Sequence, residues 1–370
     1  MLWYFLFLLA LVFCLFIGKG YFRKNTTLFF YIILPSFICF GYMIGSDWRM
    51  YETEFYDVSQ RLETKEPSYY LLAQSFKAIG FGFWEFSILY KLIGYYVFLN
   101  IYRRYSCNNI WGLVYWFPNY ALFLWMDHPA RNFIAIIIFS CALVYVEKGE
   151  FKKFLILYLL ASSFHATCLV MLSVYFVVRM TPNKKYNIWL IVIVVMFFVA
   201  EFLKIYLAPL LEVLNMEERM KSYMLEEDTT AKMSITRFGI FFVLLMLASI
   251  YIDVLRKKVR YADFILKLSF MYVVFFCIGN IHNIFFRFQY FLMIPICVLV
   301  SYLCLYLPRF IIRQGLRAFI IVLAFVYMQN LITRDSQYIP YSNYLQYTFE
   351  EKPSYNYRYQ YNLKNSPYKK

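Results

Sequence analysis

The feature that most constrains this chain is its series of uncharged, apolar stretches, each about as long as a bilayer is thick. A helix needs about 20 such residues to cross a membrane, and roughly 17–25 are tolerated. Hydrophobic residues make up 62% of the 370 residues and charged residues only 16%, which lies outside the range of soluble domains. We therefore predict an all-α, polytopic integral membrane protein. The predicted spans are 2–18, 27–45, 84–102, 109–126, 131–146, 187–205, 235–254, 263–280, 286–307 and 316–333.

The apolar stretch 154–178 fits either one tilted helix or a hairpin, and basic residues flank both of its ends. Cytoplasmic loops collect Lys and Arg, so loop charge decides between the two. With a hairpin, the short loops on one face carry 18 Lys/Arg and three acids, and the long loops 46–68 and 206–234 carry 12 acids and six bases. A single crossing would move later basic loops outside. We therefore predict a re-entrant hairpin that turns near 162–165, ten full crossings, and both termini outside.

The domain organisation follows from the same pattern, because no hydrophilic stretch is long enough for a separate soluble domain. We expect one transmembrane domain over 1–333, with the loops 46–68 and 206–234 outside. The shorter segment 69–80 carries a lysine and is typical of a helix that lies at the membrane edge. The tail 334–370 is rich in Tyr, Asn and Lys, so we expect it to be external and poorly ordered.

The polar residues that are candidates for a functional site gather on the predicted outer face. They lie in the charged, aromatic segment after Ser46, in Asp127–Arg131 and in Asn280–Arg287, and His165 approaches the same face from the hairpin. Each has an ordinary alternative, since arginines reach lipid headgroups and charged loops are solvated. Their joint placement on one face favours a functional site there.

Several classes of function lack support in the sequence. It contains no Walker loop and no G-x-G-x-x-G, H-E-x-x-H or G-x-S-x-G motif, so we predict neither a nucleotide site nor a metalloprotease. No metal site or cofactor is predicted. The net charge of +15 is typical of cytoplasmic Lys and Arg in a membrane protein, and nucleic acid is not an expected partner.

Several short motifs follow one another along the chain. They are Gly45-Ser-Asp-Trp-Arg-Met-Tyr51, Glu66-Pro-Ser-Tyr69, His128-Pro-Ala-Arg131-Asn-Phe-Ile-Ala135, Lys152-Lys-Phe-Leu with Ala161-Ser-Ser-Phe-His165, and Arg287-Phe-x-x-Tyr290-Phe. Through these motifs the chain resembles the EpsG family of bacterial exopolysaccharide polymerases, which are similar to Wzy-type O-antigen and capsule polymerases. The resemblance covers about residues 40–175 and extends more loosely into the distal half. Asn132 stands where the family usually carries Gln, which is also an amide.

This resemblance implies a glycosyltransferase of the bacterial inner membrane with its active site facing the periplasm and a GT-C-like architecture. The growing glycan would move en bloc from undecaprenyl pyrophosphate onto a new lipid-linked repeat unit. Several members of the family need no metal. The implied partners are the undecaprenyl-pyrophosphate-linked oligosaccharide and membrane lipid, with a chain-length regulator and a flippase of the same pathway as further candidates.

The chemistry of such a transfer assigns roles to the outer polar residues. Arginine forks hold a departing pyrophosphate bidentately, and a base within hydrogen-bond reach takes the acceptor proton. Asp47 is our first choice for the base, because it follows an uncharged stretch, with Glu66 and His165 as alternatives. The expected pyrophosphate ligands are Arg131, Arg287 and Arg49, and the expected sugar-binding residues are Trp48, Tyr51, Tyr69, His128 and Tyr290.

Three other functions stay open at this point. A glycan ligase or a single-sugar transferase would use the same face and similar groups. A lipid-glycan flippase or another transporter would place its charges near mid-bilayer and often has inverted repeats; we find no internal repeat, and the charges cluster at one face. An acyltransferase for surface sugars would need a deep histidine base, for which His165 is the one candidate.

Overall fold

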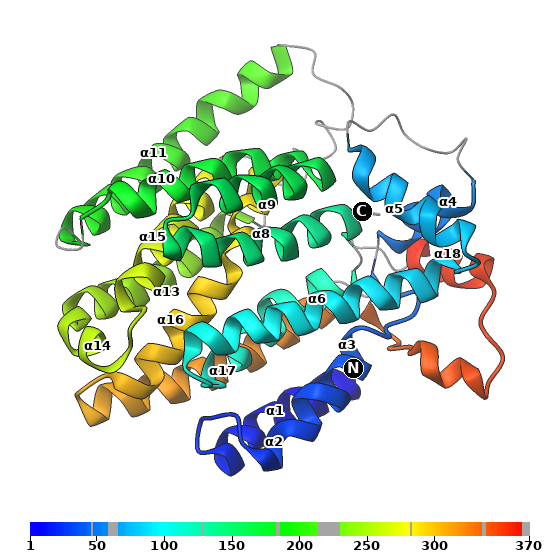
Figure 1. Cartoon of the computed structure of the whole chain (residues 1–370), viewed down its shortest axis with the longest axis horizontal. Helices are drawn as coiled ribbons and strands as arrows, with labels where there is room; N and C mark the ends of the chain where they lie inside the picture. Colours follow the sequence, from blue (N-terminus) through cyan, green and yellow to red (C-terminus); the bar gives the residue numbers. More distant parts are fainter. Residues whose placement is uncertain are drawn as a thin grey trace. The chain divides into compact units, whose positions relative to one another are not determined.

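A computed structural model describes residues 1–45, 47–57, 66–127, 129–182, 186–213, 230–281, 283–334 and 338–364. Regular structure in these ranges is helical, and extended backbone pairs in two isolated bridges, Tyr21 with Asn109 and Gly41 with Asn343 (Figure 1). The predicted all-α class is confirmed for the described residues.

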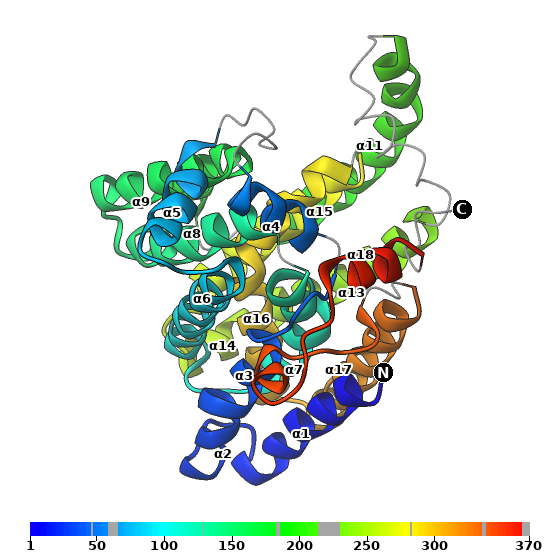
Figure 2. The same ribbon diagram turned by 90° about the vertical axis from the view of Figure 1, so that its right-hand side faces the viewer.

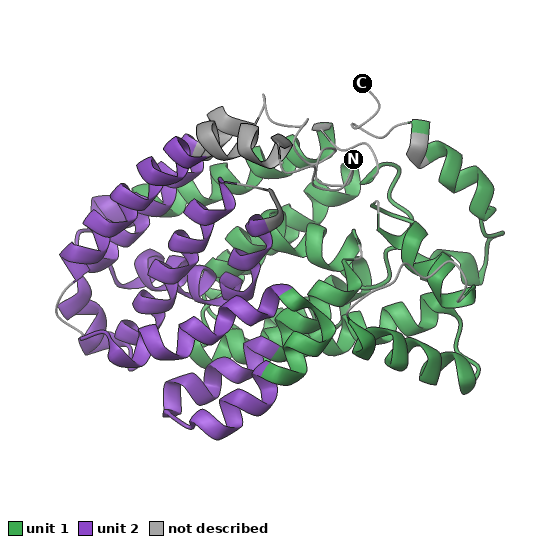
Figure 3. Cartoon of the chain, turned by 90° about the horizontal axis from the view of Figure 1, so that it is seen from above, with its two compact units in different colours: residues 1–138, 159–166, 314–370 green, residues 139–158, 167–313 purple. Residues whose placement is uncertain are grey.

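The chain divides into two compact units (Figure 3). The first comprises Met1–Ile138, Leu159–Ala166 and Gln314–Lys370, and the second comprises Phe139–Tyr158 and Thr167–Arg313. The single transmembrane domain expected over 1–333 stays a prediction. Helices that lie in the first unit are α1 (Leu2–Gly18), α2 (Lys24–Leu28), η1 (Phe29–Ile33), α3 (Leu34–Ile38), α4 (Trp48–Tyr56), α5 (Pro67–Ala78), α6 (Phe83–Ser106), α7 (Trp111–Trp116), η3 (Phe117–Met126), η8 (Tyr344–Thr348) and α18 (Tyr355–Lys364).

Three helices pass from one unit to the other: α8 (Ala130–Lys148), α9 (Phe151–Phe164) and α17 (Phe310–Arg334). The second unit holds η4, α10 (Leu172–Met180), α11 (Tyr186–Val213), α13 (Thr230–Ile250), α14 (Ile252–Lys258), α15 (Ala262–Gly279), η6 (Asn283–Leu292) and α16 (Met293–Tyr306). The 3₁₀ helix η4 (Ala166–Met171) begins at the boundary of the two units. Since α11 continues to Val213, the loop predicted from 206 begins later, and residues 214–229 lie outside the described ranges.

Among the described residues, five helices are long and apolar enough to cross a membrane, or six if the bent pair Ile235–Ile250 and Ile252–Lys258 forms one span. This count rests on length and composition alone. It falls short of the ten predicted crossings, which are therefore not confirmed. The predicted span 2–18 corresponds to α1, an apolar helix of 17 residues. The five helices are Ala130–Lys148, Tyr186–Leu203, Ala262–Gly279, Phe285–Tyr306 and Phe310–Thr333.

The predicted span over 27–45 was wrong in its extent, because its helix ends at Ile38. Met43 and Gly45 have positive φ angles of 50° and 83°, so regular helix does not resume in the rest of the predicted span. In the predicted span 109–126 the helix widens to π geometry from Phe117. Pro118 follows at the second position, and proline cannot donate the usual backbone hydrogen bond.

The predicted hairpin is present as a reversal of the chain, and Figure 1 shows α9 and α10 side by side. Helix α9 ends at Phe164, just before His165, and the chain returns through η4. The hydroxyl of Tyr158 donates to the carbonyl of Leu169 (3.0 Å), and the ring of Phe154 lies 5.0 Å from that of Tyr175. These contacts pair α9 with the returning segment, first at η4 and then at α10. Its placement in a membrane stays a prediction.

The C-terminal segment is ordered from Tyr338 to Lys364, so the expectation of a poorly ordered tail was wrong for these residues. Arg358, which is only 4% exposed, donates from Nε to the carbonyl of Met43 (2.9 Å) and from Nη2 to that of Pro340 (3.0 Å). Composition does not indicate this order, because polar side chains of the tail donate hydrogen bonds to backbone carbonyls near α3 (Figures 1 and 2). The three bonds are Tyr341 to Phe37, Ser342 to Tyr42 and Asn343 to Ser36.

Candidate active site

The candidate site is built largely by two short helices of the first unit, α4 and α5. On α5, Tyr69 and Ala73 are four residues apart and buried, so they share one face of the helix. On α4, Tyr51 and Phe55 have the same spacing and are also buried. Glu66 occupies the N-cap of α5, and a proline follows at the first helical position, where its missing N–H costs nothing.

The loop before α4 lies against the loop before α8. Gly45 has a φ of +83°, and a Cβ at this position would collide with Asp127. The backbone N–H of Asp47 donates to the carbonyl of Asp127 (3.3 Å). Glycine is therefore required here both for its backbone conformation and for space. The contact brings together the segment after Ser46 and Asp127–Arg131, two of the polar segments that we expected to converge.

Glu66 is the centre of the polar contacts in this region. One carboxylate oxygen, Oε1, lies 2.6 Å from Nδ1 of His165 and accepts a hydrogen bond from the backbone N–H of Ala166 at 2.9 Å. The other, Oε2, lies 3.6 Å from Nε of Arg131. The side chains of Glu66, His165 and Arg131 are 13%, 12% and 17% exposed. Three residues that are distant in the chain thus form one largely buried cluster.

The environment of Glu66 fixes its charge and the orientation of His165. Burial alone would raise the pKa of Glu66, but the hydrogen bond and charge of His165, the Ala166 N–H and Arg131 together hold that pKa below its usual value. An ionised carboxylate only accepts hydrogen bonds, so Nδ1 of His165 is the donor. In the neutral ring Nε2 then carries the lone pair. Nε2 is buried and has no hydrogen-bond partner among the described residues.

Two tyrosines line the site beside Arg131. Nε of Arg131 donates to the hydroxyl of Tyr51 at 3.3 Å. The ring of Tyr51 meets that of Tyr69 edge to face, with centroids 5.3 Å apart. Burial raises the pKa of Tyr51 to about 12, although Arg131 acts in the opposite direction. Both hydroxyls are therefore neutral near pH 7, and burial also raises the pKa of Tyr69 well above its usual value.

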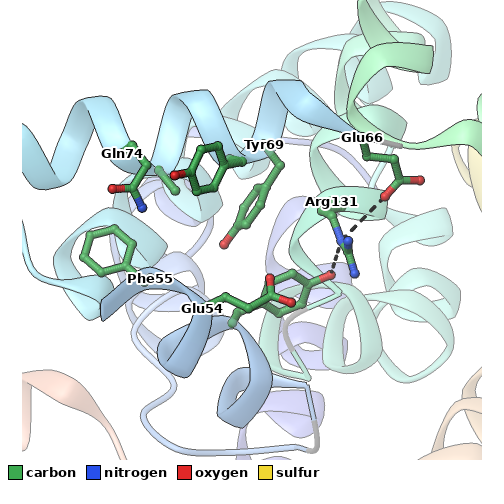
Figure 4. A pocket seen from close by; sticks show the side chains of 9 residues that line it. Glu54, Phe55, Glu66, Tyr69, Gln74 and Arg131 are labelled. Atoms are coloured by element: carbon green, nitrogen blue, oxygen red, sulfur yellow. Dashed lines mark hydrogen bonds and ion pairs between the residues drawn. The ribbon is translucent and has the colours of Figure 1, made fainter. Parts of the chain in front are cut away.

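These residues surround a pocket of about 350 Å³, part of which is open to solvent (Figure 4). Figure 4 shows Glu66 and Arg131 at one side of it and Phe55 with the amide of Gln74 at the other. Small-molecule sites combine apolar walls with a few converging polar groups in this way. The lining residues are Tyr51, Glu54, Phe55, Glu66, Tyr69, Tyr70, Ala73, Gln74 and Arg131.

Asp47, our first choice for the base, lies at the N-cap of α4 and is half-buried. Its side chain does not cap the helix, and its backbone carbonyl accepts from the N–H of Tyr51 (3.3 Å). Asp47 is near the site in the chain but is not among the residues that line the pocket. Its role as the base stays a prediction.

Trp48 and Arg49 contact protein groups in this structure. Trp48 is fully buried, with ring centroids 5.8 Å from Trp84 and 5.6 Å from Tyr355. The guanidinium of Arg49 lies 5.5 Å from the ring centroid of Tyr359 in the C-terminal segment. This packing gives Trp48 a core role and ties Arg49 to the tail, and their predicted ligand-binding roles stay untested.

The other predicted residues fall elsewhere. His128 lies outside the described residues, as does His282. Arg287 is half-buried in η6 of the second unit, and Tyr290 of the same helix packs on Phe286. Among the described residues, no three or more His, Cys, Asp or Glu side chains are arranged to hold a metal ion.

Sequence reasoning missed Gln74, Glu54 and Phe55 as parts of the site. A signal for them was present, because Gln74 follows Glu66 by eight residues, or about two helical turns. Glu54 and Phe55 follow Tyr51 by three and four residues, the spacing of neighbours on a helix surface. We had assigned no helix to 48–56, so this spacing was not used.

The apolar helices and the buried carboxylate–histidine pair beside an arginine define a helical membrane protein with an enzyme-like site. The profile of the EpsG family matches residues 24–343. Since this is most of the chain, the protein belongs to the EpsG family, the family of Wzy-type polysaccharide polymerases. The family predicted from the motifs is thereby confirmed. No curated protein and no solved structure matches the chain.

Proposed function

We propose that this protein is a GT-C-like glycosyltransferase that polymerises undecaprenyl-pyrophosphate-linked oligosaccharide repeat units at the periplasmic face of the bacterial inner membrane. Membership of the EpsG family supports the reaction class. The observation that carries the proposal is the buried Glu66–His165 pair beside Arg131. A base and a cation close together are the two groups that glycosyl transfer from a pyrophosphate requires.

The transfer forms one bond and breaks one. A hydroxyl oxygen on the terminal sugar of the acceptor bonds to the anomeric carbon of the growing glycan. The bond from that carbon to the pyrophosphate oxygen breaks, and undecaprenyl pyrophosphate leaves with the electron pair. The hydroxyl proton passes to a base. General-base assistance of this kind contributes on the order of 10²–10⁴-fold.

His165 is the base in this proposal, and Glu66 orients it. Glu66 accepts from Nδ1 at 2.6 Å, which leaves the lone pair on the buried Nε2. The carboxylate also stabilises the imidazolium that forms when the proton arrives. Asp47 remains the rival base, and its substitution separates the two assignments.

Arginines hold the leaving group. Both contacts of Arg131 described above use Nε, so we assign its terminal nitrogens to the pyrophosphate. A guanidinium fork matches two phosphate oxygens at once. Arg287 and Arg49 are the further proposed ligands, and a chain-length regulator and a flippase of the same pathway are the proposed protein partners.

The test is a deletion of the gene in its host, with the surface glycan profiled on a gel. A polymerase is supported if only the single-repeat rung remains and the wild-type gene restores the ladder. Loss of all surface glycan would indicate a flippase or an earlier transferase instead. Purified protein that forms polymer from lipid-linked repeats alone would separate a polymerase from a ligase.

A further inference from the structure

The pocket has two ends with different chemistry. Figure 4 shows Glu66 and Arg131 at one end and Gln74 with Phe55 at the other, and Tyr69 lies between them. We propose that the Gln74 end is a subsite for one neutral sugar ring, the terminal sugar of the acceptor repeat unit. This inference rests on the proposed function and assigns a substrate group to part of its site.

The charges in the pocket favour a neutral ligand at this end. The lining residues include two acids, Glu54 and Glu66, and one base, Arg131. Arg131 lies 3.6 Å from Glu66, so its charge is already partly balanced. A pyrophosphate at the Gln74 end would meet the negative charge of Glu54, and the lining residues include no base besides Arg131. A sugar carries no charge and meets no such repulsion.

Two polar groups line the proposed subsite, one at this end and one between the two ends. The hydroxyl of Tyr69 and the side-chain nitrogen of Gln74 are buried and have no hydrogen-bond partner among the described residues. A buried polar group without a partner costs folding free energy, so such groups call for an explanation. An amide and a phenol together donate and accept hydrogen bonds, and each sugar hydroxyl can do the same.

The apolar walls match the other half of a sugar, its C–H surface. Phe55 and Ala73 are 2% and 4% exposed and line the pocket with the ring of Tyr51. The volume of about 350 Å³ includes space that is open to solvent, so the enclosed part of the pocket is too small for a complete repeat unit.

The register of α5 connects this subsite to the proposed chemistry. Glu66 and Gln74 are eight residues apart on one helix, which corresponds to about 12 Å along its axis. A ring bound by Gln74 and Tyr69 would lie on the Gln74 side of Glu66, whose carboxylate holds His165. The hydroxyl of that ring that faces Glu66 is then the one nearest the proposed base.

The test compares Gln74→Leu and Tyr69→Phe with wild type, as purified full-length protein in lipid nanodiscs. The substrate is the lipid-linked repeat that accumulates in cells without this protein. Each variant should raise KM about 3- to 10-fold, the effect of one lost hydrogen bond, and leave kcat within threefold. Binding of the free oligosaccharide, released from the lipid by mild acid, should weaken by the same factor. Inhibition by undecaprenyl pyrophosphate should stay unchanged.

Thermal unfolding separates a binding role from a structural one. Because neither polar group has a described protein partner, both variants should unfold at or above the wild-type temperature. The matched control is Ser75→Ala, since Ser75 is the exposed neighbour of Gln74 and bonds to the carbonyl of Leu71 in its own helix. It should change neither KM nor oligosaccharide binding.

The outcomes distinguish this inference from the proposed function. If wild-type protein polymerises and both variants keep the wild-type KM and oligosaccharide affinity, the subsite is wrong and the polymerase assignment stands. If the variants instead lose undecaprenyl pyrophosphate inhibition, the pocket holds the leaving group and the subsite is also wrong. If wild-type protein forms no polymer but binds the oligosaccharide through Gln74, the polymerase assignment fails and the subsite stands.

Discussion

Glu66 and His165 lie 99 positions apart in the chain, and their side chains meet at 2.6 Å. Glu66 follows the charged segment, and His165 sits at the reversal between α9 and η4. The same carboxylate oxygen accepts from the N–H of Ala166, the first residue of η4. Glu66 therefore holds the turn of the hairpin in place as well as the ring of the histidine.

We predict that Glu66→Gln and His165→Asn each lower polymer formation by about 10²–10⁴-fold. The amide at 66 keeps the shape but no longer stabilises an imidazolium, and asparagine at 165 cannot act as a base. Turnover and binding should be measured separately on purified protein with lipid-linked repeats, and binding should stay within a few-fold of wild type.

The control for this pair is Glu150→Gln, because Glu150 forms an exposed ion pair with Lys153, and such pairs contribute little to stability.

Asp47→Asn distinguishes between the two candidate bases, Asp47 and His165. If it abolishes turnover while His165→Asn is tolerated, Asp47 is the base and the Glu66–His165 pair is structural. If both are tolerated, the arginines supply most of the catalysis through the leaving group.

Arg131→Lys should also reduce polymer strongly at unchanged protein level. Lysine keeps the charge but loses the planar fork, and one ammonium cannot both bond to Tyr51 and face a pyrophosphate as the guanidinium does. The control is Arg260→Lys at a side chain that is 81% exposed, and polymer is read on gels beside an immunoblot. Full activity of Arg131→Lys would mean that this arginine does not hold the pyrophosphate and only contacts lipid headgroups. Arg287→Lys tests the corresponding assignment in the second unit.

Gly45→Ala should destabilise the protein and disturb the approach of Asp127 to Asp47. An alanine at φ +83° is strained by about 1–2 kcal/mol, and its Cβ would also overlap Asp127. The control is Gly80→Ala, because Gly80 has a φ of +92° and nothing within 4 Å of the added carbon. Thermal unfolding should therefore show a larger loss for Gly45→Ala. Equal losses would mean that Asp127 moves aside without cost.

The helical class and the family could be predicted from the sequence, since apolar length and motif order are local properties of the chain. The reversal at His165 was predicted because loop charge constrains topology. Among the proposed residues, Glu66, His165, Arg131, Tyr51 and Tyr69 are brought together by the structure. Their mutual contacts depend on tertiary packing, which spacing alone does not specify.

Other features could not be read from the sequence for physical reasons. Apolar length suggested helix through Gly45, but the helix ends at Ile38, and two positive φ angles keep the segment after it irregular. Trp48 is predicted to stack on a sugar, which stays a prediction, and the sequence alone does not show that its ring is buried in the core. The tail looked disordered because its composition is polar, yet Arg358 makes its bonds to backbone carbonyls, which composition does not reveal.

The ordered tail gives a further prediction at Arg358. Arg358→Met leaves the carbonyls of Met43 and Pro340 without this donor, and each lost bond of a buried group costs about 1–3 kcal/mol. Thermal unfolding should occur several degrees lower, and hydrogen exchange should rise in 41–57. Arg309→Met, at an exposed position, is the control. Unchanged exchange in 41–57 would show that the tail does not support this segment.

The last prediction concerns pH and the buried carboxyl of Glu52, which accepts a hydrogen bond from Nε1 of Trp84 at 2.9 Å. Burial raises the pKa of Glu52 to about 7, although that bond acts in the opposite direction. A raised folded-state pKa means that the folded protein holds this proton more tightly than the unfolded chain. The contribution to stability is therefore complete below the unfolded pKa of about 4.5 and is lost as pH rises through about 7. Glutamine mimics the protonated acid at every pH and keeps an oxygen for Trp84. Glu52→Gln should thus match wild type in thermal unfolding at acidic pH, exceed it at pH 8.5, and polymerise normally. Glu150→Gln, at an exposed pair, should show no such gain at high pH. An equal difference between Glu52→Gln and wild type at both pH values would mean that folding does not raise the pKa of Glu52.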